Sequence, residues 1–87
     1  MIINVLIFFE IMELNDFIAN FAAQFDETDE SMFKADTEFR TLDEWSSLTG
    51  LSIIAMVDEE YDVTLKGDDI KSAETIEDLF KTVQSKL

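Results

Sequence analysis

The sequence contains no cysteine, no histidine and no proline, and only two glycines stand among its 87 residues. Without cysteine the chain can form no disulfide and has no thiolate nucleophile, and without cysteine and histidine the usual zinc sites are excluded. A serine–histidine–aspartate triad is excluded as well, and two isolated glycines cannot build a glycine-rich phosphate loop. We therefore expect a protein that is not itself an enzyme and that holds no metal ion.

Basic residues are also scarce, with six Lys and Arg against 20 Asp and Glu and a net charge of −14 at pH 7. Such a surface repels the phosphates of nucleic acids and anionic membranes, so basic protein patches are the expected partners. The apolar fraction of 47% suffices for one modest core, which fits a single small domain. The absence of cysteine is compatible with the reducing cytoplasm, and we expect a cytoplasmic monomer.

Residues 1–11 (MIINVLIFFEI) differ in composition from the rest of the chain, because they are almost wholly apolar. The segment is too short to cross a bilayer, which takes about 20 apolar residues, and it lacks the basic flank and cleavage site of a secretory signal. It is an extra element packed on the domain, an interfacial anchor, or a product of too early a start codon. We favour an early start or a loosely attached extension, with the domain itself at residues 12–87.

Three helical patterns and one long connection follow. Apolar residues recur at helical spacing first at residues 14–25, then in a helix at 47–61, and finally after a capping box formed by Thr75 and Asp78. A short helical turn is expected after Gly67. The connection from Phe25 to Trp45 has no strong period, and its scattered apolar residues predict a loop pinned to the core at Met32, Phe33, Phe39, Leu42 and Trp45. The predicted fold is all-α, a small antiparallel bundle of three to four helices with a long loop between the first and second.

The helix at 47–61 carries two apolar strips. The first is expected to face the core, and Gly50 on it suggests close packing against another helix; Met56 falls among the polar positions. The second strip either packs under the long loop or stays exposed for a partner or ligand. The first strip comprises Gly50, Ile53, Ile54, Val57 and Tyr61, and the second comprises Leu48, Leu51 and Ala55.

Two adjacent serines stand where this helix begins. Serine is a preferred N-cap, so Ser46 can cap the helix while Ser47 occupies its first turn with the hydroxyl pointing outward. A phosphate ester on that hydroxyl would meet free backbone N–H groups and the positive end of the helix dipole. The position therefore suits a group attached through a phosphodiester, although capping alone explains a serine here.

The segment Trp45-Ser46-Ser47-Leu48, followed by an apolar helix that ends in Asp58-Glu59-Glu60-Tyr61, resembles the acyl carrier proteins. The family pattern is Asp-Ser-Leu before such a helix, and the downstream Asp68-Asp69-Ile70 and Thr75-Ile76 resemble the starts of the family's last two helices. The resemblance covers about residues 12–87.

The resemblance implies a carrier that serves other enzymes in fatty-acid, polyketide or related biosynthesis. It implies that a phosphopantetheinyl transferase moves 4′-phosphopantetheine from coenzyme A onto Ser47, and that acyl groups travel on this arm as thioesters. The arm supplies the thiol that the chain lacks. The partners implied are this transferase and acyl-loading or acyl-processing enzymes with basic docking patches. The matching contact positions are Leu48, Leu51, Ala55, Asp58 and Glu59.

The sequence departs from the family pattern in two ways. Ser46 replaces the usual aspartate, and no acidic residue lies between Ser47 and Asp58, so docking would depend also on Asp43 and Glu44 before the helix. These departures suggest a specialised carrier. Two alternatives remain open: an acidic helical interaction module of the same fold without a prosthetic group, and a carrier of aminoacyl groups.

If residues 12–87 form the whole domain, removal of residues 1–11 should leave the thermal unfolding midpoint unchanged. The measurement is thermal denaturation of the two chain lengths, followed by circular dichroism. A large loss of stability in the shortened chain would show that the segment is part of the fold.

Overall fold

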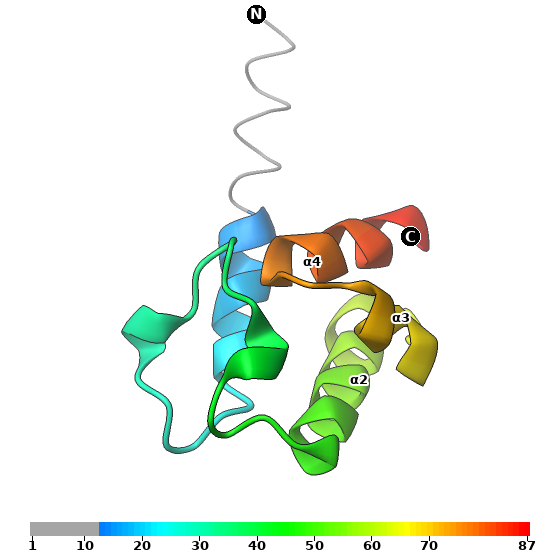
Figure 1. The fold of residues 1–87 in the computed structure, drawn as a ribbon. Helices are drawn as coiled ribbons and strands as arrows, with labels where there is room; N and C mark the ends of the chain where they lie inside the picture. The colour runs from blue at the N-terminus through cyan, green and yellow to red at the C-terminus, as the bar shows by residue number, and fades with distance from the viewer. Residues whose placement is uncertain (1–12) are drawn as a thin grey trace, which may run out of the picture.

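The computed structural model describes residues 13–87, within which the chain forms helices and no strand (Figure 1). The predicted all-α class is confirmed, and the expected short helical turn is present as α3. Our prediction for residues 1–11 lies outside the described residues. The elements are a helix at residues 13–22, two 3₁₀ helices η1 (Glu30–Met32) and η2 (Phe39–Thr41), and the helices α2 (Ser47–Tyr61), α3 (Gly67–Ser72) and α4 (Ile76–Ser85).

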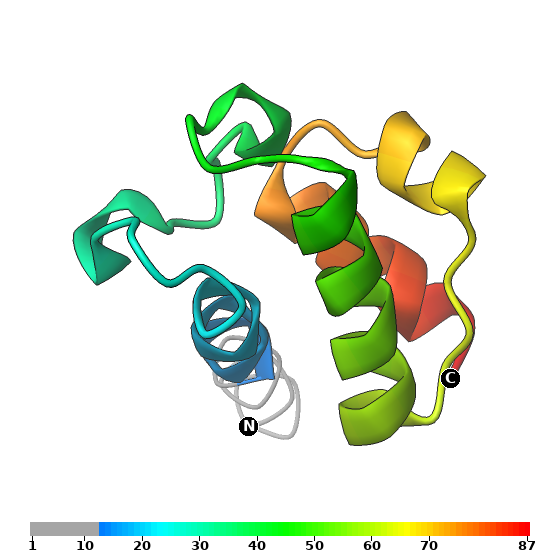
Figure 2. The ribbon, with the colours of Figure 1, turned by 90° about the horizontal axis from the view of Figure 1, so that it is seen from below.

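The helices enclose one core, with the long connection on one side of α2 and α3 on the other (Figures 1 and 2). The helix at residues 13–22 and α2 run in opposite senses in Figure 1, and α4 lies across them. The predicted apolar face of α4 is buried throughout, at Ile76, Leu79, Phe80 and Val83. None of the described helices is long and apolar enough to span a membrane.

Aromatic side chains form the centre of the core. Phe21 lies within 5.4–6.4 Å, centroid to centroid, of four other phenylalanine rings. These contacts continue from Phe17 to Phe80 of α4 at 5.5 Å, and from Phe39 to Trp45 at 5.1 Å. Aromatic pairs at such spacings add to the stabilisation from burial alone. The rings around Phe21 are those of Phe17, Phe25, Phe33 and Phe39.

The long connection is anchored as predicted at most of its apolar residues. Phe33 and Phe39 are buried, and Leu42 and Trp45 pack against the core while remaining partly exposed. The prediction for Met32 is wrong, because this side chain is 53% exposed. It belongs to η1, none of whose residues is buried.

The same connection also completes the start of α4. The Ile76 and Glu77 amides donate to the carbonyls of Thr37 and Ala35 at 3.2 and 2.9 Å. The first amides of a helix have no acceptor within the helix, so they need partners elsewhere. The predicted Thr75–Asp78 capping box is present as well.

Helix α2 shows which of its two apolar strips faces the core. Ile53 and Val57 of the first strip are fully buried, as predicted. The alternative in which the second strip packs under the loop is wrong. Leu48 is 76% and Leu51 is 62% exposed, and Ala55 is exposed too. The placement of Met56 on the polar side is also wrong: it is buried, because α2 is flanked on two sides and buries a wider arc than one strip.

Gly50 packs against a side chain of the preceding loop, and not against another helix as we predicted. A Cβ atom at Gly50 would lie 3.5 Å from Cζ2 of Trp45, which is ordinary van der Waals contact. The glycine therefore leaves room for a methyl group beside the indole ring.

We expect Gly50→Ala to stabilise the protein by up to about 1 kcal/mol, because alanine is favoured over glycine in a helix interior and the added methyl meets no clash. Urea denaturation at equilibrium measures the difference. Gly67→Ala, at the first residue of α3 with no neighbouring atom within 4 Å, is the control for glycine outside a helix interior. Destabilisation by Gly50→Ala would show that Trp45 cannot accommodate the methyl group.

Candidate functional site

The start of α2 is built by reciprocal hydrogen bonds between Ser46 and Thr49. Ser46 is the N-cap, and its hydroxyl accepts from the Thr49 amide at 3.4 Å. The Thr49 hydroxyl in turn accepts from the Ser46 amide at 2.7 Å, which closes a capping box. The prediction that Ser46 caps this helix is confirmed, and Thr49 is a partner that was not predicted.

Ser47 is the first residue of α2, and it is exposed. An N-terminal turn of a helix carries backbone N–H groups without intrahelical acceptors and the positive end of the helix dipole. An oxygen-linked anion on Ser47 would therefore sit in a favourable field without displacing the cap, which uses its neighbour.

The residues predicted to bind partners lie along the solvent side of α2 and just before it. Leu48, Leu51 and Ala55 form an exposed apolar strip that begins directly after Ser47. Asp58 and Glu59 are also exposed, on the last turns of the helix, about 16 Å along its axis from the first turn. Asp43 is exposed in the loop before it.

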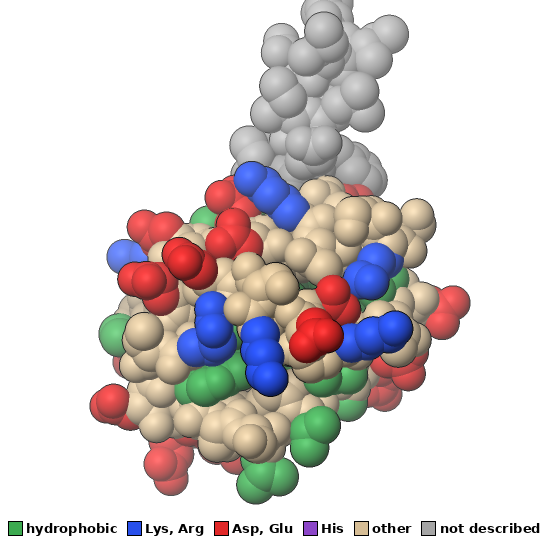
Figure 3. Space-filling view, turned by 45° about the vertical axis from the view of Figure 1, so that its right-hand side comes forward, with side chains coloured by type: hydrophobic (Ala, Val, Ile, Leu, Met, Phe, Trp, Pro, Cys, Tyr) green, Lys and Arg blue, Asp and Glu red, His purple; other side chains and the backbone are tan. Residues whose placement is uncertain are grey.

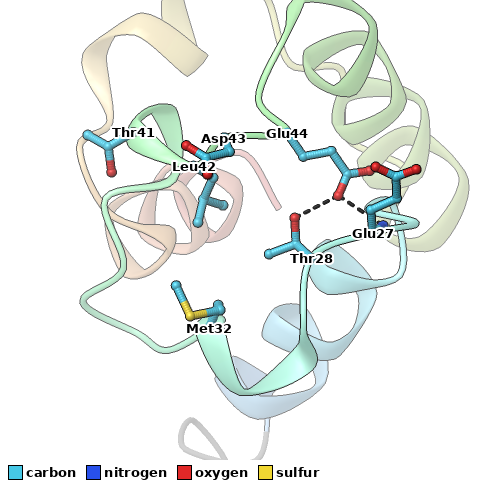
Figure 4. A pocket seen from close by; sticks show the side chains of 7 residues that line it. All are labelled: Glu27, Thr28, Met32, Thr41, Leu42, Asp43 and Glu44. Carbon is cyan, nitrogen blue, oxygen red and sulfur yellow. Dashed lines mark hydrogen bonds between the residues drawn. The ribbon is translucent and has the colours of Figure 1, made fainter.

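Glu44 has a structural role that its sequence position did not indicate. One carboxylate oxygen accepts the Asp26 amide at 2.9 Å. The other accepts the Glu27 amide at 3.1 Å and the Thr28 hydroxyl at 2.6 Å (Figure 4). The hydrogen bond from Thr28 is the largest of the effects that hold the pKa of Glu44 below its usual value of 4.5. This side chain joins the two ends of the long connection; its predicted part in docking stays a prediction.

A hollow of about 450 Å³ lies beside this bridge, between the two halves of the connection (Figure 4). Met32 and Leu42 supply its apolar wall, and Glu27, Asp43 and Glu44 its acidic rim. Within residues 13–87 no three acidic side chains are arranged to hold a metal ion. Apart from the half-buried Thr28, the run 26–30 is exposed, as expected for a solvated loop.

A second groove, of about 450 Å³, adjoins Ser47 between α2 and α3. This groove is not predictable from the sequence, because its walls come from three separate segments. Apolar side chains supply most of the surface, and two basic side chains supply charge. The lining residues are Trp45, Ser46, Ser47, Gly50, Leu51 and Ile54 on one side, with Gly67, Ile70 and Lys71 of α3 and Arg40 of η2 on the other.

Comparison of the chain with models of protein families, with curated proteins and with solved structures found no match.

We expect Glu44→Gln to destabilise the protein at neutral pH, because both carboxylate oxygens accept hydrogen bonds and the amide replaces one of them with a donor. The folded pKa of Glu44 is lowered, so its contribution is complete above the unfolded value of 4.5 and is lost as the pH falls through the folded value. The stability difference between the natural chain and the variant should therefore shrink below pH 4.5.

Denaturant unfolding measured between neutral and acidic pH checks this expectation. Asp43→Asn is the matched control, because it removes the same charge from the adjacent residue without removing these hydrogen bonds. Equal effects of the two substitutions at neutral pH would show that only net charge matters at this place.

Proposed function

We propose that this chain is a phosphopantetheine-dependent acyl carrier, with Ser47 as the attachment residue. The observation that carries the proposal is that two adjacent serines occupy different positions at the start of α2. Ser46 holds the N-cap of α2, which leaves Ser47 exposed in the first turn. A serine that is free of the cap but lies within the field of the helix terminus suits a permanent phosphodiester.

The attachment step fits the surroundings of Ser47. In it, the Ser47 Oγ–P bond forms, the pyrophosphate bond of coenzyme A breaks, adenosine 3′,5′-bisphosphate leaves, and the hydroxyl proton passes to a base of the transferase. The free backbone N–H groups of the first turn stabilise the resulting phosphodiester charge. The attached group supplies a terminal thiol, which forms thioesters with acyl groups.

The groove beside Ser47 offers an apolar surface within reach of anything attached there. Trp45, Leu51, Ile54 and Ile70 line it, and Gly50 adds no side chain that would narrow it. An acyl chain that folds back from the arm can pack against these side chains and so be removed from water. This burial is favourable by about 25 cal/mol of free energy for each Å² of apolar surface buried.

The exposed strip of α2 supports docking of partner enzymes. Leu48 and Leu51 are the most exposed large apolar residues of the helix, and Asp43 and Asp58 place carboxylates on either side of the strip. A basic patch with an apolar centre is complementary to this arrangement, and complementary charge chiefly speeds and orients association. In this proposal the transferase and the acyl-processing enzymes approach the same face in the cytoplasm.

One observation favours a second candidate, an interaction module of the same fold without a prosthetic group. The exposed Leu48 and Leu51 and their acidic flanks suffice to bind a basic partner helix. In that case the serines serve only the start of α2.

The deciding measurement is the intact mass of the protein after incubation with coenzyme A and a promiscuous phosphopantetheinyl transferase. We expect the addition of one phosphopantetheine, its loss in Ser47→Ala, and its retention in Ser46→Ala. The Ser46 variant should lose about 1 kcal/mol of stability through the cap, so it is assayed at a temperature at which circular dichroism shows it folded.

Failure of several transferases to modify the folded chain would favour the interaction module. Modification that persists in Ser47→Ala and disappears in Ser46→Ala would move the attachment site by one residue.

A further inference from the structure

The charged residues that line the groove beside Ser47 are basic, whereas the molecule as a whole is strongly acidic. The chain has 20 acidic residues and six basic ones. No acidic residue among residues 13–87 lines this groove, whereas Arg40 and Lys71 both do. Figure 3 shows a face of the molecule on which blue side chains lie beside exposed apolar ones, with red side chains on the same face. A local excess of positive charge in so acidic a protein needs its own explanation.

The two cations belong to one wall of the groove, across from α2. The guanidinium of Arg40 donates from Nη2 to the carbonyl of Ala73 at 2.8 Å, which fixes it beside the end of α3. Lys71 lies in the last turn of α3, two residues before Ala73. One bond to Ala73 leaves Arg40 most of its five N–H donors for another acceptor.

Neither Arg40 nor Lys71 is paired with a carboxylate among residues 13–87. The ion pair found within these residues joins Lys86 and Asp69 at 3.7 Å. Apart from these cations and the two serines the groove is lined mainly by apolar side chains, with Leu51 and Ile54 on the α2 side. A ligand complementary to this lining combines a short apolar part with an anionic end.

We propose that the groove selects an acyl group with a carboxylate at the end remote from the thioester, held by Arg40 and Lys71. This inference rests on the proposed carrier function, and it specifies the class of cargo. The methylenes of such a group cover the apolar wall, and its carboxylate accepts charge-assisted hydrogen bonds from the cations.

The phosphodiester of the arm is a less suitable occupant, for two reasons. It is fixed at Ser47, in the first turn of α2, where backbone N–H groups already favour it. It also carries no apolar part at the position of Trp45, Leu51 and Ile54, which form the greater part of the groove.

The test compares two cargoes of equal chain length, glutaryl and valeryl, loaded onto the full chain from their coenzyme A thioesters by a promiscuous transferase. Cleavage of each thioester by hydroxylamine, a small nucleophile that is mainly uncharged at neutral pH, reports how well the groove shields the cargo. We expect Lys71→Gln to speed cleavage of the glutaryl thioester about threefold, the effect of losing one exposed ion pair, and to leave the valeryl thioester unchanged.

Two further variants make the comparison specific. Lys81→Gln removes the same charge from α4, away from the groove, and should change neither rate. Arg40→Gln should act in the same direction as Lys71→Gln, with circular dichroism as the check that loss of the bond to Ala73 leaves the fold intact. Amide chemical shifts of Ile54 and Ile70 should differ between glutaryl- and valeryl-loaded protein.

Equal acceleration for both cargoes in Lys71→Gln would overturn the inference and assign the cations to the phosphodiester. Unchanged glutaryl cleavage in both Lys71→Gln and Arg40→Gln would overturn it as well. In both cases the intact mass still reports loading, so the carrier function stands. If neither thioester is loaded, the carrier function and the inference fall together.

Discussion

The structure of the site depends on the packing of Trp45. Its ring meets Phe39 edge-on at 5.1 Å, stacks on Phe25 at 6.4 Å, and lies over Gly50 on the first turns of α2. The residue directly precedes Ser46, so the aromatic core fixes the position of the N-cap through one peptide unit. The candidate attachment serine is thus placed by a rigid cluster of rings, although it stands at the end of a connection of more than 20 residues.

Several acidic side chains of residues 13–87 accept hydrogen bonds from backbone amides. Asp78 accepts the amides of Thr75 and Glu74, and the first of these contributes most to the lowering of its pKa. Glu44 accepts two amides of the connection, and Asp69 accepts the amide at the start of α3. Asp69 is also paired with Lys86 at 3.7 Å, whereas Glu44 and Asp78 are held by hydrogen bonds alone. Hydrogen bonds from amides stabilise these carboxylates where cations are few, which helps the fold to tolerate a net charge of −14.

Periodicity in the sequence predicted the helices and the buried face of α4, because an amphipathic helix encodes its own inner face. The role of Ser46 followed from another local signal, the preference of serine for the N-cap, although its partner Thr49 was not identified. Periodicity failed at Met56, whose burial depends on a second neighbour of α2, and at Met32, where apolar character alone suggested burial. It missed the groove with Arg40 and Lys71, because residues so far apart in sequence meet only in the fold.

The carbonyls of Ala35 and Thr37, which receive the first amides of α4, have a consequence for how the chain folds. The first amides of α4 gain these acceptors only when a segment far earlier in the sequence has reached its place, and closing that long loop costs chain entropy. We therefore expect the first turn of α4 to be completed only after the connection has packed against it. A bundle of this helical content with short turns would have local contacts throughout and would fold faster.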